Sequence, residues 1–142
     1  MKSTASIETI ATLLRAISQP VRLEILLAIG TGEACVCHLE AAIGQRQAYI
    51  SQQLMALRET GVVKSRREGR NIYYQIKNPQ VLDLIQTAGE ISGQEHGELR
   101  ITGPENLLGY CTCPKCTFQN PDGPPEENTQ NYLFHRKENK QW

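Results

Sequence analysis

Residues 36–76 limit the folds open to this chain more than any other part of it. Residues 36–43 are predicted to form a short helix that Gly44 ends, and residues 46–60 a second helix that Gly61 ends. In the second helix Ile50, Leu54 and Leu57 recur at spacings of four and three, which predicts one buried stripe. Two short helices joined by a glycine-containing turn predict a helix-turn-helix that spans roughly residues 35–61.

Two extended segments follow directly. Residues 62–67 and 71–76 are rich in β-branched and aromatic side chains and flank the turn at residues 68–70, which predicts a β-hairpin. The tip of this hairpin gathers Arg66, Arg67 and Arg70. Taken alone, such a cluster is equally compatible with a solvated hairpin end. Beside a helix-turn-helix it favours a wing that contacts phosphate.

Three further helices are expected around this motif. The first places Ile7, Ile10, Ala11, Leu14 and Ile17 on one face, at three- and four-residue spacing. The second begins near Pro20, is expected to be buried nearly all round, and is closed by Gly30 and Gly32. The last begins near Pro79, and its apolar set is Val81, Leu82, Ile85, Ala88 and Ile91.

These elements predict a mainly α fold with a small β-hairpin, a winged helix-turn-helix. We expect a DNA-binding and dimerisation domain over residues 1–98 and a cysteine-containing, partly disordered C-terminal tail over residues 99–142. The first and last helices are expected to pair across a two-fold axis, since helices at both ends of so small a domain need a covering surface. A homodimer of this kind suits a palindromic operator.

The charge of the chain is unevenly distributed. The formal net charge is zero, but residues 1–80 carry ten lysines and arginines against six glutamates, a local charge of +4. A basic half of this kind can bind a polyanion. With no apolar run long enough to span a membrane and no secretory leader in its first residues, the chain is expected to be cytoplasmic, without a membrane partner.

The polar side of the second helix of the motif suits contact with double-stranded DNA. We expect side chains of this helix near base edges: Gln47, Tyr49, Ser51 and Gln53. Arginines of the same helix and of the hairpin are expected near phosphates: Arg46, Arg66, Arg67 and Arg70.

Five cysteines fall into two groups, Cys35 with Cys37 and Cys111 with Cys113 and Cys116. In a cytosolic chain such groups indicate metal ligands or redox thiols before structural disulfides. Residues two apart on an α-helix point about 200° away from each other, whereas in an extended segment they share a face. If Cys35 and Cys37 bind one ion, the start of the first helix of the motif must therefore be non-helical or be distorted by binding.

Several segments of the chain resemble the ArsR/SmtB family of metal-responsive repressors. The resemblance spans about residues 8–92. The segment Glu33-Ala34-Cys35-Val36-Cys37-His38-Leu39 is similar to the family's Glu-Leu-Cys-Val-Cys-Asp-Leu metal box. Residues 19–26, 50–63 and 67–74 also match the family pattern. It implies a winged-helix homodimer that represses a resistance operon and releases DNA when metal binds.

The chain departs from the family pattern at two places. His38 replaces the family's aspartate, and a capping or surface histidine is favoured over an added ligand. Some relatives bind zinc between paired last helices. Asp83 and His96 match that pattern here, but Ile85 and Leu99 occupy the other two ligand places, which argues against such a site.

The second cysteine group lies outside the part that matches the family. Cys111, Cys113 and Cys116 could form a separate zinc knuckle or a redox-active tail. The favoured hypothesis is that one or two of them complete the Cys35/Cys37 site, from the same subunit or from the other. Thiolate ligands select soft ions, so the expected inducer is As(III), Cd(II), Pb(II) or Zn(II).

Two other functions would make different demands on the cysteines. A thiol redox or persulfide switch on the same fold would need accessible cysteines of low pKa. An enzyme would need a pair such as Cys37 and His38, but no third group that orients them is identifiable and adjacent residues rarely form a catalytic dyad. The sequence therefore predicts a regulator and not an enzyme.

Overall fold

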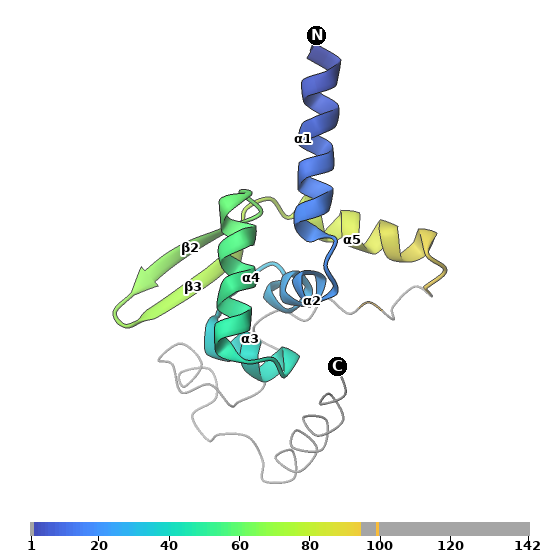
Figure 1. The fold of residues 1–142 in the computed structure, drawn as a ribbon. Helices are drawn as coiled ribbons and strands as arrows, with labels where there is room; N and C mark the ends of the chain where they lie inside the picture. Colours follow the sequence, from blue (N-terminus) through green and yellow to red (C-terminus); the bar gives the residue numbers. More distant parts are fainter. Residues whose placement is uncertain (1, 95–98, 100–142) are drawn as a thin grey trace.

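The structure is a computed structural model that describes residues 2–94 and residue 99 (Figure 1). Along the chain the elements are α1 (Lys2–Ile17), α2 (Pro20–Ile29), β1 (Glu33–Cys35), α3 (Val36–Ile43), α4 (Gln47–Glu59), β2 (Val63–Glu68), β3 (Asn71–Ile76) and α5 (Gln80–Ile91). The mainly α fold class with a β-hairpin wing is confirmed.

The core forms around one side of α2. The prediction that this helix is buried nearly all round is wrong, because Glu24 is exposed and Leu23 and Leu27 are half-buried. Pro20 occupies the first turn, and the buried side chains of the helix are Ile25, Leu26, Ala28 and Ile29. Gly30, at φ 57°, donates its N–H to the Leu26 carbonyl and ends the helix. Side chains from α3, α4, the sheet and α5 close the same cluster, so one core holds the described elements together.

The helix-turn-helix ends where the glycines predict. Gly44 lies in the left-handed region at φ 76° and caps α3, and Arg46 is the extended residue that precedes α4. At the other end of α4, Gly61 donates to the Arg58 carbonyl and Val62 to the Leu57 carbonyl. This pair of bonds is a Schellman motif with Gly61 at its left-handed position, which turns the chain from α4 into β2.

The sheet contains one strand more than the sequence predicted. β2 and β3 form the expected hairpin, and β1 pairs with the outer edge of β3, so that the strand order is β1-β3-β2 and all neighbours are antiparallel. β1 has three residues, too few for a recognisable alternation, and its partner is about 40 residues away. Its pairing is a tertiary contact.

The two faces of the sheet differ. Ala34, Val63, Tyr74 and Ile76 are buried in the main core. The opposite face carries Cys35, Tyr73 and Arg66 side by side, because Cys35 is the register partner of Tyr73 and Tyr73 that of Arg66. Tyr73 and Cys35 form a second, small buried cluster there, with Cys37 packed against it.

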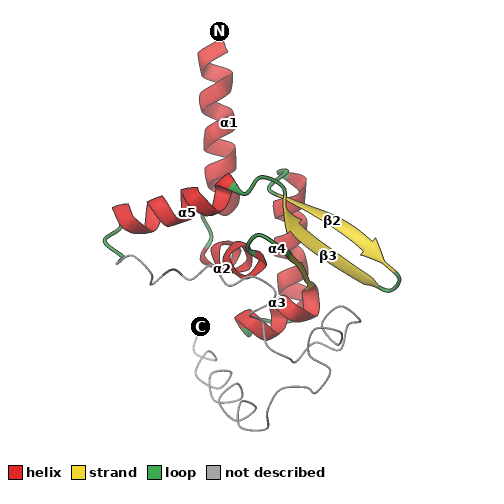
Figure 2. Cartoon of the chain, turned by 180° about the vertical axis from the view of Figure 1, so that it is seen from behind, coloured by secondary structure: helices red, strands yellow, loops and turns green. Residues whose placement is uncertain are grey.

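α1 projects from the rest of the molecule (Figures 1 and 2). Ala16 and Ile17 at its C-terminal end are buried, whereas Ile7, Ile10 and Leu14 are 65%, 56% and 44% exposed. In both views α5 lies beside the base of α1. Most of the apolar face of α1 is therefore not covered by the described residues.

Replacing Leu54 with alanine tests the buried stripe of α4. Leu54 is completely buried, so the substitution is expected to lower the free energy of unfolding by about 2–5 kcal/mol. The neighbouring Met55 is 61% exposed, and Met55→Ala is expected to change it by less than about 0.5 kcal/mol. Urea denaturation of both variants at one protein concentration measures the difference, and equal losses would show that α4 packs on another face.

Candidate nucleic-acid interface and thiol site

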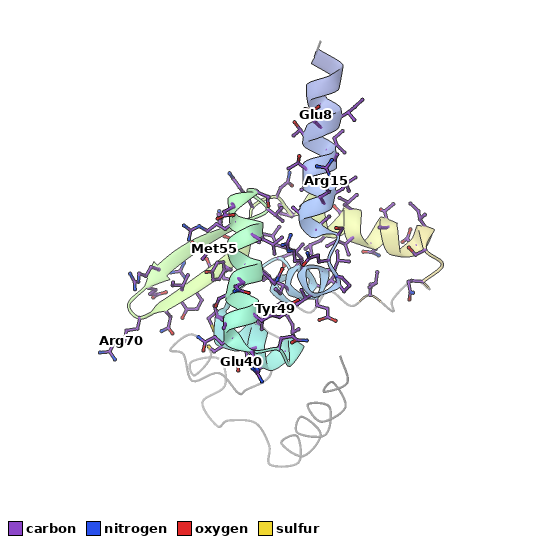
Figure 3. All side chains as sticks on the ribbon, viewed as in Figure 1. Glu8, Arg15, Glu40, Tyr49, Met55 and Arg70 are labelled. Carbon is purple, nitrogen blue, oxygen red and sulfur yellow. The ribbon has the colours of Figure 1, made fainter. Side chains whose placement is uncertain are left out.

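The outer side of α4 is its most exposed helical face. Ile50, Leu54 and Leu57 are buried against the core. Ala48, Gln52 and Met55, at spacings of four and three, form the opposite, exposed face. Figure 3 shows Tyr49 near the start of α4 and Met55 further along it. A helix exposed along one side in this way can enter a major groove.

The side chains expected to contact DNA do not share one face of α4. Arg46, Gln47 and Tyr49 are exposed at its N-terminal end, whereas Ser51 and Gln53 are half-buried on its flanks. Each step of two residues turns the helix by about 200°, so four alternate residues spread around its circumference. Sequence reasoning passed over Gln52 and Met55, although the helical period opposite Ile50, Leu54 and Leu57 points to them.

Gln53 has a partner inside the protein. Arg22 of α2 donates through Nε to Gln53 Oε1 at 2.8 Å and through Nη1 to the Ala16 carbonyl at 2.9 Å. One guanidinium therefore joins the end of α1 and the middle of α4. Near the other end of α4, Arg58 Nη1 donates to Ser65 Oγ of β2 at 3.2 Å, which ties the helix to the hairpin.

The arginines of the hairpin lie in different environments. Arg67 is exposed, and Arg70 projects at the exposed tip (Figure 3). Arg66 instead forms ion pairs with Glu33 of β1, at 2.7 Å, and with Glu68 of its own strand, at 2.8 Å. Hydrogen bonds from Arg66 to these carboxylates, first Glu33 and then Glu68, raise the pKa of Arg66 above its ordinary value.

Cys35 and Cys37 face each other at the start of α3. Cys35 is the extended residue before the helix, at φ −84° and ψ 164°, and Cys37 is in the first turn. Their Sγ atoms are 2.8 Å apart, longer than the about 2.05 Å of a disulfide bond. The structure thus meets the condition set by the sequence, because the first cysteine lies outside the helix. Cys35 is 3% exposed and Cys37 is half-buried.

Among the described residues, no cluster of candidate ligands surrounds this pair. Within residues 2–94 and 99, no group of three or more His, Cys, Asp or Glu side chains could hold a metal ion. Cys111, Cys113 and Cys116 lie outside the described residues. Of the two roles expected for His38, the surface position is wrong, because His38 is 4% exposed and lies with Leu39 on the side of α3 that packs inward. The capping role stays a prediction.

The last helix provides no zinc site among the described residues. Asp83 is exposed, Ile85 is buried in the core, and Leu99 packs over Gly89 of α5. His96 lies outside the described residues. At the two places where relatives have ligands, Ile85 and Leu99 therefore act in packing.

Two features bear on possible partners. Exposed apolar side chains cluster on α1, at Ile7, Ile10 and Leu14, and on α5, where Leu84 is 36% and Ile91 82% exposed. Contiguous exposed apolar side chains typically mark a protein interface. In the described part of the chain, no helix is long and apolar enough to span a membrane.

The sequence of the chain is similar to those of known transcription regulators. Residues 19–65 match the helix-turn-helix family described as bacterial regulatory protein, arsR family. The HTH-type transcriptional regulator NmtR of Mycobacterium tuberculosis is 37% identical over 93 residues, which are 66% of this chain and 76% of that protein. The transcriptional repressor SmtB homolog of Synechocystis is 35% identical over 83 residues, 58% of this chain and 63% of that repressor. The match to that repressor thus spans just under two thirds of its length.

Solved structures show the same architecture. Reduced HlyU from Vibrio cholerae has a TM-score of 0.58 and 26% identity, over 66% of this chain and 98% of that one. The homodimeric winged helix-turn-helix DNA-binding domain of a Mycobacterium bovis protein has a TM-score of 0.57 and 27% identity, over 68% and 94% of the two chains. The winged helix-turn-helix predicted from the sequence is confirmed.

Proposed function

The chain belongs to the ArsR family of bacterial transcription regulators, and we propose that it is a homodimeric repressor whose operator binding is controlled by Cys35 and Cys37. The family and the fold are those of DNA-binding regulators and not of enzymes. In this proposal a thiophilic ion, As(III), Cd(II), Pb(II) or Zn(II), binds the cysteine thiolates and releases the DNA. The protein would act in the cytoplasm, where operator DNA is found.

One observation carries the proposal: Cys35 Sγ and Cys37 Sγ lie 2.8 Å apart where β1 ends and the helix-turn-helix begins. Cys35 precedes α3, and α3 packs against α4, the helix proposed to read DNA. A ligand that draws Cys35 and Cys37 together acts on the first turn of α3 and through it on α4. Coupling between two such sites is typically about 5- to 150-fold in affinity.

The thiol pair needs further ligands for the ions proposed. Thiolate zinc sites are usually four-coordinate and As(III) takes three sulfurs, whereas the described residues offer two. We propose that one or two of Cys111, Cys113 and Cys116 supply the rest, from the same subunit or from its partner.

For DNA binding we propose two surfaces. The exposed side of α4, with Gln47, Tyr49 and Gln52, would contact bases, and Arg46 would contact a phosphate beside them. Arg67 and Arg70 of the wing would bind further phosphates. Ser51 and Gln53 are turned towards the flanks of the helix, so we give Gln53 the role of holding α4 through Arg22.

The same thiols support a second candidate function, a redox switch. In the reduced protein, two thiols this close (2.8 Å between the Sγ atoms) can lose two electrons and two protons to peroxide or polysulfide and join as a disulfide. A structural relative, HlyU, has been described in a reduced form. Like a bound ion, a disulfide would draw the two sulfurs together and act on the start of α3. Both candidate functions would therefore reach α4 through α3.

The inducer is identified by operator affinity of the reduced protein with and without each ion. A DNA duplex that the ion-free protein selects from a random-sequence library serves as the operator. We expect at least one of As(III), Cd(II), Pb(II) and Zn(II) to weaken binding about 5- to 150-fold, with thiolate-to-metal absorption in the ultraviolet. Cys35→Ser should keep the ion-free affinity and lose the response.

A parallel titration with peroxide or polysulfide separates the two candidates. Release of DNA by the oxidant, with every ion inactive, would replace metal sensing by redox sensing. Affinity that no ion and no oxidant changes would reject both.

Two neighbouring glutamines test the orientation of α4. Gln52→Ala is expected to weaken specific binding about 5- to 150-fold, the range of a bidentate base contact, and to leave thermal stability unchanged. Gln53→Ala removes the acceptor for Arg22, so it should cost about 1 kcal/mol of stability with a smaller effect on specific binding. The reverse pattern would place Gln53, and not Gln52, at the DNA.

A charged substitution tests the dimer interface. Ile10→Glu puts a carboxylate in the exposed apolar face of α1 and is expected to shift sedimentation from dimer to monomer at micromolar concentration. Ile72→Glu is the matched control, because Ile72 is 39% exposed on the wing, away from α1. An Ile10→Glu protein that stays dimeric would move the interface elsewhere.

A further inference from the structure

The outer face of the sheet brings the thiol pair and the wing together. Cys35, Tyr73 and Arg66 are register partners across β1, β3 and β2, so their side chains lie in one row on one face. Glu33 lies two residues before Cys35 in β1 and therefore shares this face. Tyr73 thus lies between Cys35 of the candidate thiol site and Arg66 of the wing.

The contacts in this row are specific. Arg66 donates from Nη2 to Glu33 Oε2 at 2.7 Å and from Nε to both Glu33 oxygens, at 3.2 and 3.3 Å. Its Cζ atom lies 5.0 Å from the centroid of the Tyr73 ring, within the range of a cation–π contact. Tyr73 is 3% exposed and packs against Cys35 and Cys37. The guanidinium is thus bound to Glu33 of β1 and lies against the tyrosine that packs against Cys35 and Cys37.

We propose that Glu33, Arg66 and Tyr73 form a latch that transmits the state of Cys35 and Cys37 to the wing. In this proposal, which rests on the proposed function, Arg66 is a positioning residue and not a phosphate contact. An ion or a disulfide that changes the spacing of the two sulfurs acts on the end of β1 and on the Tyr73 ring. Glu33 lies at the start of the same three-residue strand and carries the change to Arg66 and so to β2.

The charges of the latch agree with this role. Two carboxylates surround the Arg66 guanidinium, Glu33 at 2.7 Å and Glu68 at 2.8 Å, which leaves little positive potential to attract a phosphate. Of the two ion pairs, the one with Glu33 connects β2 to β1, since Glu68 belongs to β2 itself. Glu68 is therefore a matched control, with the same chemistry and the same partner but no connection to the thiol strand.

The test compares full-length wild type, Glu33→Gln, Glu68→Gln and Arg66→Gln, with and without Cd(II). The first measurement is the operator affinity without Cd(II) divided by the operator affinity with Cd(II). Loss of a carboxylate slightly raises DNA affinity in both conditions, so this effect cancels in the ratio. Glu33→Gln and Arg66→Gln should each reduce this ratio about two- to fivefold, as expected for a partly exposed ion pair. Glu68→Gln should leave the ratio as in the wild type.

The second measurement needs no DNA. Amide hydrogen exchange of peptides from residues 63–76 should change on Cd(II) binding in the wild type and in Glu68→Gln, and much less in Glu33→Gln. Ultraviolet thiolate-to-Cd(II) absorption verifies that each variant still binds the ion. Thermal unfolding verifies that each is folded.

The outcomes separate the latch from the proposed function. A wing that responds to Cd(II) through Glu33, in a protein whose DNA affinity ignores Cd(II), supports the latch and rejects metal-controlled DNA release. An operator response that is equal in wild type and Glu33→Gln keeps the proposed function and overturns the latch. The latch is also overturned if Arg66→Gln weakens ion-free binding to all DNA sequences and lowers the salt dependence of DNA affinity by about one phosphate contact. Arg66 would then be a phosphate contact.

Discussion

The pairing of β1 with β3 is the contact on which the rest of the site depends. It places Cys35 opposite Tyr73 and holds the residues before α3 in an extended conformation, so that the second cysteine can enter the helix while the first stays outside it. Without this strand, α3 could begin earlier, and residues two apart on a helix cannot face each other. The same pairing covers Tyr73, which a two-stranded hairpin would leave open on that side.

The direction of α4 follows from a different set of contacts. Three completely buried side chains fix which face of the helix meets the core, and bonds from Arg22 to Gln53 and from Arg58 to Ser65 hold its two flanks. A helix fixed on three sides presents a defined fourth side to solvent. A small shift of α3 can therefore reorient the whole exposed face of α4, because the helix moves as a unit.

Exposed apolar side chains on α1 and α5 give the proposed dimer its basis. The described residues bury Ile25, Leu26, Ala28 and Ile29 of α2 but leave most of the apolar face of α1 exposed to water. A second subunit that covered this face would gain the free energy of apolar burial. A two-fold axis through these helices would place two copies of α4 on one duplex. The thiol pair, at the N-terminus of α3, would then act on both half-sites.

The sequence by itself determined the elements whose signals are local. Helical spacing of apolar residues predicted α1, α4 and α5, and Pro20 with the glycines after it predicted α2. Glycines at left-handed positions predicted the ends of α3 and α4, and β-branched and aromatic segments around Gly69 predicted the hairpin. The spacing of Cys35 and Cys37 also determined that any shared ligand requires a break in the helix there. Each of these follows from residues a few positions apart, which interact in any fold that contains them.

The tertiary structure decided what depends on distant partners. It added β1, whose three residues gain their conformation only from β3. It turned Gln53 towards Arg22 and Arg66 towards Glu33, although both side chains look free to bind DNA in the sequence. It buried His38 inside the packing of α3. A polar residue can hydrogen-bond with water, DNA or protein equally well, so only the groups that folding brings within reach determine which it contacts.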